Sequence, residues 1–260
     1  MLSTISTFII IILVVNQQYI FASNFSIISS ILIVILKILS VNLRNILIAK
    51  KDKFSLEKFI FFRITFSIII FLLSIFIFDF FNFSKNTFYY YLILIILVNW
   101  CNEVTLVKIE INKNYILSNL LFYSNSIILL LILSFSLLSS FIYIKYFLVV
   151  FLLFNLVFLL INTNNQSFNF LNFFTKDIIN ILNSSFNSLS FLSSLTLNLA
   201  NLIWRISIIY LIGDKLASII IVFFALGSFP GSIFVSSFGP TMVKKKVKPS
   251  ILSKFFIIYF

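Results

Sequence analysis

One line of polar side chains ends in an arginine and is the part of this sequence best suited to chemistry. Its members are three or four residues apart, the spacing of one face of an α-helix, and the residues between them are almost all apolar. Arginine suits oxyanions, because its planar fork can donate two hydrogen bonds to one phosphate. We call this line the polar stripe; its members are Asn180, Asn183, Asn187, Ser190, Ser194, Asn198, Asn201 and Arg205.

Composition places the polar stripe in a membrane rather than in water. Of the 260 residues, 61% are hydrophobic and 10% are charged, and the mean hydropathy is +1.16. A soluble chain of this length needs more polar surface than that. The apolar runs are roughly 20 residues or longer, which predicts an all-α bundle of transmembrane helices and not the short alternating strands of a β-barrel.

An arginine inside a bilayer must face a partner or a water-filled cavity. We therefore interpret the stripe as the wall of a polar pathway, with Ser194, Asn198, Asn201 and Arg205 as candidate substrate-binding residues. Two alternatives remain open. Serine and asparagine on membrane helices also join neighbouring helices, and Arg205 either snorkels to the membrane surface or pairs with Asp214.

A second candidate cation, Lys37, lies near the end of the apolar run 19–41. It faces the same cavity as Arg205 in one interpretation, and it snorkels to the nearby membrane surface in the other. An interrupted polar line on the same helical face favours the first interpretation; besides Lys37, it comprises Ser23, Ser26, Ser30, Ser40 and Arg44.

Two carboxylates are candidates for coupling transport to protons or sodium. Glu103 stands at the end of the fourth apolar run, where it caps the helix end, pairs with Arg44 or Arg63, or forms a gate. Asp79 stands at the opposite, outer end of the third run, where we expect an interfacial position.

A proline within the eighth apolar run predicts a break in that helix. Pro230 removes a backbone hydrogen bond, and Gly231 beside it allows local unwinding. A broken helix at membrane depth is tolerated beside protein or a cavity, and transporters use such breaks at their binding sites. The alternative is a static kink without a functional role.

The sequence argues against most enzyme and cofactor chemistry. It has no histidine, and Cys101 is its single cysteine, so histidine metal sites, thiolate clusters and serine–histidine triads are excluded. No metal-ligand spacing, phosphate-binding glycine loop or nucleotide-binding domain is present. We therefore expect no cofactor and no enzymatic activity.

The lysines and arginines predict the membrane topology. The apolar runs are 1–15, 19–41, 60–81, 88–107, 117–138, 142–161, 179–212 and 216–238, with another beginning near Ile251. Fourteen of the 19 basic residues fall on one set of alternate connections or at the span ends beside them, and three fall on the other set. The positive-inside rule then places the N-terminus and the basic connections in the cytoplasm. The net charge of +12 reflects this topology and an attraction to anionic membrane lipids, and not nucleic-acid binding.

An asparagine-rich connection suggests two helical lobes. We expect a six-helix N-terminal lobe over residues 1–161, a cytoplasmic linker over 162–178, and an incomplete second lobe over 179–260.

Three segments carry a family resemblance. They are SVNLRNILIAK at 40–50, NEVTLVKIEINK at 102–113, and ASIIIVFFALGSFPGS at 217–232 running on to Gly239 and Pro240. Together they resemble the polysaccharide-lipid flippases, the O-antigen and capsule (lipopolysaccharide-type) exporters of the multidrug/oligosaccharidyl-lipid/polysaccharide, or MATE-like, superfamily. The third segment is the most specific of the three.

This resemblance implies two helical lobes around a cationic cavity in a bacterial inner membrane, working by alternating access. The substrate it implies is an isoprenoid-pyrophosphate-linked oligosaccharide, moved to the outer leaflet during polysaccharide biosynthesis. By analogy Arg205 and Lys37 face the pyrophosphate, and polysaccharide-assembly proteins are partners. Family members carry two complete lobes, whereas this chain stops in the third apolar run of its second lobe, so we expect a fragment or a protein that needs another chain.

Three other interpretations remain open. A cation-coupled multidrug exporter of the same superfamily is expected to keep carboxylates inside its bundles. A membrane polysaccharide polymerase or ligase is expected to have a large outer loop with histidines. A non-transporting scaffold is the third.

Overall fold

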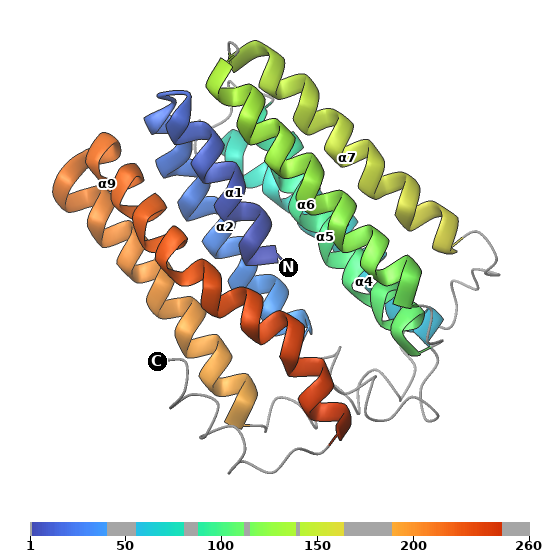
Figure 1. Cartoon of the computed structure of the whole chain (residues 1–260). Helices are drawn as coiled ribbons and strands as arrows, with labels where there is room; N and C mark the ends of the chain where they lie inside the picture. Colours follow the sequence, from blue (N-terminus) through green and yellow to red (C-terminus); the bar gives the residue numbers. More distant parts are fainter. Residues whose placement is uncertain are drawn as a thin grey trace.

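The computed structural model describes residues 2–40, 56–80, 88–111, 115–138, 141–163 and 189–245, and the account below concerns these residues. This part of the chain is all-α, as the sequence predicted (Figure 1). Its seven helices are α1 (Leu2–Val15), α2 (Tyr19–Ser40), α4 (Leu56–Phe80), α5 (Phe88–Ile111), α6 (Tyr115–Leu138), α7 (Phe141–Thr163) and α9 (Leu189–Lys245).

Each helix coincides with a predicted apolar run or a pair of runs. The differences lie at helix ends: α9 continues to Lys245 and α5 to Ile111, beyond the predicted ends at 238 and 107, and α4 begins at Leu56 and not near residue 60. Its first turn, with Glu57 and Lys58, is made of good helix formers, so the helix extends beyond the apolar run that we used to define it. Residues 179–188, the expected start of the seventh span, lie outside the described part.

A glycine divides α9 into two arms that fold back on each other (Figure 1). Gly213 has φ 78° and ψ 166°, a backbone conformation that only glycine adopts readily. We call residues 189–212 the first arm and residues 214–245 the second arm. The break lies in the predicted gap between the seventh and eighth apolar runs.

The turn between α1 and α2 is stabilised by its own polar groups. Asn16 donates a hydrogen bond from Nδ2 to the carbonyl oxygen of Ile12 at 2.8 Å, which satisfies a carbonyl at the helix end. Gln17 follows with φ 58°, so the chain reverses and α2 begins at Tyr19.

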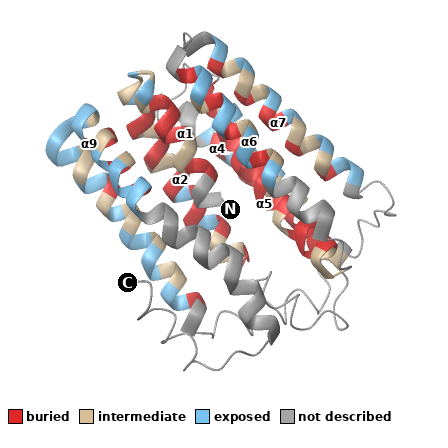
Figure 2. Ribbon diagram, in the orientation of Figure 1, coloured by how far each residue is buried: buried red, intermediate tan, exposed pale blue. Residues whose placement is uncertain are grey.

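The helices pack in two groups that share one apolar core (Figures 1 and 2). In one, α9 packs against α2 and α1; in the other, α5 packs against α4, α6 and α7. The short helix α1 lies between them and contacts α2, α5, α6 and α9. Of the long helices α5 is the most enclosed, with 83% of its most apolar window buried, against 33% for α4 and 22% for α9.

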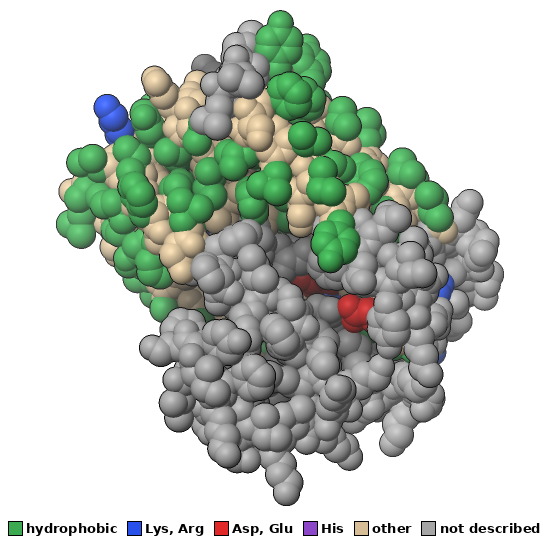
Figure 3. All heavy atoms as spheres, viewed as in Figure 1, with side chains coloured by type: hydrophobic (Ala, Val, Ile, Leu, Met, Phe, Trp, Pro, Cys, Tyr) green, Lys and Arg blue, Asp and Glu red, His purple; other side chains and the backbone are tan. Residues whose placement is uncertain are grey.

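Length and hydropathy make this a multi-pass membrane protein. Five helices, α2, α4, α5, α7 and α9, are long and apolar enough to cross a membrane. The outward faces of α4, α6, α7 and α9 carry large exposed apolar side chains, such as Phe76, Leu160 and Tyr210. Hydrophobic side chains dominate the described surface in Figure 3, as expected where lipid and not water covers the bundle.

Candidate functional site

Arg205 lies inside the bundle and not at its surface. It is on the first arm of α9, eight residues before Gly213 and so about 12 Å from the break. The residue is 7% exposed. Its Nη1 donates a hydrogen bond to the carbonyl oxygen of Ser26 on α2 at 3.0 Å, and its Nε is buried without a hydrogen-bond partner.

The alternative ion pair between Arg205 and Asp214 is not formed. The carboxylate of Asp214, which follows the break in α9, instead accepts a hydrogen bond of 2.5 Å from the hydroxyl of Ser23 on α2. The two contacts hold the two arms of α9 against one face of α2. Arg205 thus faces a neutral carbonyl, and none of the carboxylates described in the structure forms an ion pair with it.

Two serine hydroxyls share the acceptor of Arg205, the carbonyl of Ser26. Besides the guanidinium, the carbonyl oxygen of Ser26 accepts hydrogen bonds from the hydroxyls of Ser29 at 3.1 Å and Ser30 at 2.8 Å. The hydroxyl of Ser26 itself donates to the Ser23 carbonyl at 2.7 Å. Ser23, Ser26, Ser29 and Ser30 are all at most 5% exposed. The surroundings of Arg205 are therefore rich in donors.

The rest of the polar stripe is less enclosed. Ser194, Asn198 and Asn201 are half-buried, and Nδ2 of Asn198 donates to the Ser194 carbonyl of its own helix at 2.6 Å. Asn180, Asn183 and Asn187 lie outside the described residues. The binding roles of Ser194, Asn198 and Asn201 stay predictions.

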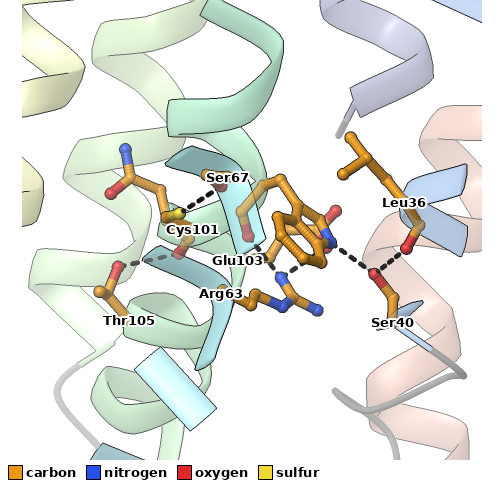
Figure 4. A network of polar contacts seen from close by, with 9 residues as sticks. Leu36, Ser40, Arg63, Ser67, Cys101, Glu103 and Thr105 are labelled. Atoms are coloured by element: carbon orange, nitrogen blue, oxygen red, sulfur yellow. Dashed lines mark hydrogen bonds and ion pairs between the residues drawn. The ribbon is translucent and has the colours of Figure 1, made fainter. Parts of the chain in front are cut away.

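A second buried arginine pairs with a carboxylate. Arg63 on α4 is 1% exposed, and its Nη1 lies 3.2 Å from Oε2 of Glu103 on α5 (Figure 4). Nη1 also donates to the Trp100 carbonyl, and the guanidinium carbon lies 4.9 Å from the centroid of the indole ring. Of the two arginines expected as partners for Glu103, Arg63 makes the contact, and Arg44 lies outside the described residues.

The same cluster reaches α2. The indole N–H of Trp100 donates to the Ser40 hydroxyl at 2.5 Å, and that hydroxyl donates to the Leu36 carbonyl at 2.6 Å (Figure 4). Lys37, half-buried on α2, interacts electrostatically with the Glu103 carboxylate. Arg205 and Lys37 therefore lie at different depths. Ser26, whose carbonyl binds Arg205, and Lys37 are eleven residues apart, or about 16 Å along α2.

Arg63 lies within the predicted apolar run 60–81, although its charge was grouped with the basic connection before that run, and the structure places it inside α4. A signal for this position was present. Arg63, Ser67 and Ser74 are four and seven residues apart, which puts them on one face of α4. The face is polar like the stripe of α9, and the Ser67 hydroxyl lies 3.2 Å from the Cys101 sulfur on α5.

Buried asparagines connect the remaining helices at the level of Glu103. Nδ2 of Asn102 on α5 donates to the Asn155 carbonyl on α7 at 3.1 Å, and Nδ2 of Asn155 donates to Oδ1 of Asn125 on α6 at 3.0 Å. Interhelical bonds between polar side chains are a common means of joining helices in membranes.

The remaining candidates stay predictions. Asp79 belongs to α4, and Pro230 and Gly231 belong to the second arm of α9, but their side chains lie outside the described residues. The backbone of α9 is helical through Pro230, so the break predicted there is not present, and the one interruption of the described helix is at Gly213. Among the described residues, no group of three or more histidine, cysteine or carboxylate side chains is placed to hold a metal ion.

Fold and site together define a class: a polytopic helical membrane bundle with two buried arginines, one neutralised by a carboxylate and one facing only neutral groups. Comparisons with protein-family models, with curated proteins and with solved structures found no match.

Proposed function

We propose that this protein is a transporter, and not an enzyme, that moves an isoprenoid-pyrophosphate-linked oligosaccharide to the outer leaflet of a bacterial plasma membrane. In this proposal Arg205 binds the pyrophosphate. The two arms of α9 move relative to α2 during transport. The basic connections face the cytoplasm, where such substrates are assembled.

The observation that carries the proposal is the environment of Arg205. A buried guanidinium without a counter-charge is costly, because the Coulomb attraction that offsets desolvation is missing. The Ser26 carbonyl supplies one neutral acceptor, and Nε has none. An anion that binds here provides the missing charge, and its binding energy is large for the same reason.

The resemblance of three segments to polysaccharide-lipid flippases selects pyrophosphate among the possible anions. Two of these segments, 102–113 and 217–240, overlap α5 and the second arm of α9. The segment 102–113 contains Glu103, which pairs with Arg63. The segment 217–240 belongs to the arm whose first residue, Asp214, contacts α2.

A cation-coupled multidrug exporter is less well supported. Such a protein needs a carboxylate that is free to exchange its cation. Glu103 does lie within α5, eight residues from its end, but its carboxylate pairs with Arg63 at 3.2 Å.

The test is transfer of a fluorescent polyprenyl-pyrophosphate-linked sugar across vesicles that contain the purified full chain. Arg205→Gln leaves a shorter, neutral side chain whose amide can still donate hydrogen bonds, so it removes the charge without placing an apolar group there. We expect a loss of transfer of about tenfold or more, the effect of one charge-assisted hydrogen bond.

Lys215→Gln is the matched control, because Lys215 is an exposed cation on the same helix, ten residues from Arg205. We expect it to transfer lipid as the parent protein does. Equal transfer by the parent protein and Arg205→Gln, with equal reconstitution, would remove Arg205 from the mechanism and overturn the proposal.

A further inference from the structure

One backbone carbonyl on α2 has more donors than it can accommodate well. Within the helix, the carbonyl oxygen of Ser26 has the place of acceptor for the backbone N–H four residues on. It also accepts from Ser29 at 3.1 Å, Ser30 at 2.8 Å and Arg205 at 3.0 Å. A carbonyl oxygen has two lone pairs. The donors therefore outnumber the lone pairs and compete for this one oxygen.

Serines in membrane helices routinely donate to a carbonyl three or four residues back. Ser74 on α4 shows that ordinary pattern, with one hydroxyl on the Phe71 carbonyl at 2.7 Å, and Ser136 on α6 shows it with the Leu133 carbonyl at 2.6 Å. The arrangement at Ser26 goes beyond this pattern. Two hydroxyls and a guanidinium converge on one neutral oxygen, and all three belong to buried residues.

We propose that Ser29 and Ser30 are further anion-binding residues, and that their hydroxyls, with the guanidinium of Arg205, form an oxyanion site between α2 and the first arm of α9. When an anion enters, the guanidinium leaves the Ser26 carbonyl and both hydroxyls rotate toward the anion. A hydroxyl hydrogen turns freely about its C–O bond, so this exchange needs little movement of the helices. This inference rests on the proposed function.

The donor set defines the chemistry of the ligand. Three neighbouring groups donate, and none of the described carboxylates is bonded to Arg205, so a cation or a neutral sugar is disfavoured. A phosphate group offers several acceptor oxygens and at least one negative charge, and it can receive a bidentate guanidinium and two hydroxyls together. The site therefore fits a phosphate or pyrophosphate group, whether free in solution or on a lipid.

The experiment measures binding by the purified full chain in lipid nanodiscs. The first assay titrates inorganic pyrophosphate by calorimetry. The second assay incorporates polyprenyl pyrophosphate into the nanodisc and measures the retained lipid. Binding in both assays indicates a general oxyanion site, whereas binding only in the lipid assay identifies the lipid-attached group as the ligand. Either result supports the site.

The variants separate the hydroxyls from the arginine. We expect the double variant Ser29→Ala, Ser30→Ala to bind about tenfold or more weakly, since hydrogen bonds to a charged group contribute strongly. The double variant Ser29→Thr, Ser30→Thr keeps both hydroxyls and should bind nearly as the parent does. Ser74→Ala is the matched control, because it removes a buried hydroxyl elsewhere in the bundle.

Two further outcomes would overturn parts of the argument separately. If the alanine double variant binds like the parent while Arg205→Gln does not, the role of the serines is wrong and the role of Arg205 stands. If neither the alanine variant nor Arg205→Gln loses binding, both this inference and the proposed function are wrong. Unchanged thermal unfolding of each variant shows that the fold is intact.

Discussion

The two buried arginines differ in what neutralises them. Arg63 has the Glu103 carboxylate, the Trp100 carbonyl and an indole face, whereas Arg205 has one backbone carbonyl. A buried pair whose charges cancel is stable only while both partners are present. We infer that Arg63 acts within the fold, and that Arg205 is available to a ligand.

Loss of one partner of the Arg63–Glu103 pair should destabilise the bundle. Arg63→Met leaves the Glu103 carboxylate without its closest counter-charge, and we expect a loss of about 3 kcal/mol in the free energy of unfolding. Thermal unfolding of the detergent-solubilised protein measures the effect. The double variant Arg63→Met, Glu103→Met should be more stable than either single variant, because no charge is left unpaired; a double variant less stable than both would contradict the pairing.

Sequence patterns predict residue positions well only where the helix containing them is well delimited. Arg205 falls within the long apolar run 179–212, so the sequence favoured a position inside the bilayer and left a snorkelling position open. Arg63 falls at the start of the predicted run 60–81, where its charge was grouped with the basic connection before it and its buried position could not be seen. The partner of Arg205 was not predictable, since the Ser26 carbonyl lies 179 residues away and backbone groups leave no trace in a sequence.

At the scale of the elements, Gly213 should be required for its backbone and not for its size. No atom lies within 4 Å of a Cβ built at this position, yet its φ of 78° and ψ of 166° disfavour any side chain. We expect Gly213→Ala to reduce the free energy of unfolding by about 1–3 kcal/mol. Gly227 is a matched control on the same helix, equally open but without a positive φ. Gly227→Ala should be neutral or stabilise by up to ~1 kcal/mol, and equal effects of the two substitutions in thermal unfolding would contradict the argument.

Side-chain hydrogen bonds join α2 to α5, among them one from Asn24 to the Tyr89 hydroxyl at 3.5 Å and one through the Ser40 hydroxyl. Ser40 accepts the indole N–H of Trp100, both residues being buried. Ser40→Ala leaves that N–H without its acceptor and should cost about 1–3 kcal/mol of stability, more than the loss of an ordinary hydrogen bond. Ser136→Ala is the control, because it removes a buried hydroxyl that donates to the Leu133 carbonyl of its own helix, α6. Denaturant unfolding followed by tryptophan fluorescence measures both variants; equal stability losses would show that the contact is unimportant.

The positions of the helices were predictable because each is a long apolar run between polar connections, and a membrane allows few alternatives. Their packing was not predictable. The sequence shows where one helix ends and the next begins, both between α1 and α2 and at Gly213. Nothing in it indicates that α9 packs on α1 and α2. That contact joins residues far apart in the chain, through serines whose partners could have been any polar group in a neighbouring helix.

For the whole molecule, polar groups gather at two depths connected by α2. Ser23 and Ser26 near its start contact α9, and Ser40 at its end contacts α5. Ser26 and Ser40 are fourteen residues apart, or about 21 Å along the helix axis, against a hydrocarbon core of about 30 Å. The buried cation of Arg205 and the ion pair of Arg63 therefore lie toward opposite faces of the membrane. The distribution of lysine and arginine predicts that the Arg63 end is cytoplasmic.

Labelling of single cysteines from one side of the membrane tests this orientation. Cys101 is the single cysteine of the sequence, so a Cys101→Ser background contains no native thiol that could be labelled. In that background we expect Lys215→Cys, an exposed position two residues after the break in α9, to react with a membrane-impermeant maleimide on intact cells. Lys108→Cys, near the opposite end of the bundle at the end of α5, should react only after the membrane is permeabilised. The reversed pattern would place Arg205 toward the cytoplasm and Arg63 toward the outside. Pyrophosphate would then reach Arg205 before transfer and not after it, so the orientation decides which half of the transport cycle the oxyanion site serves.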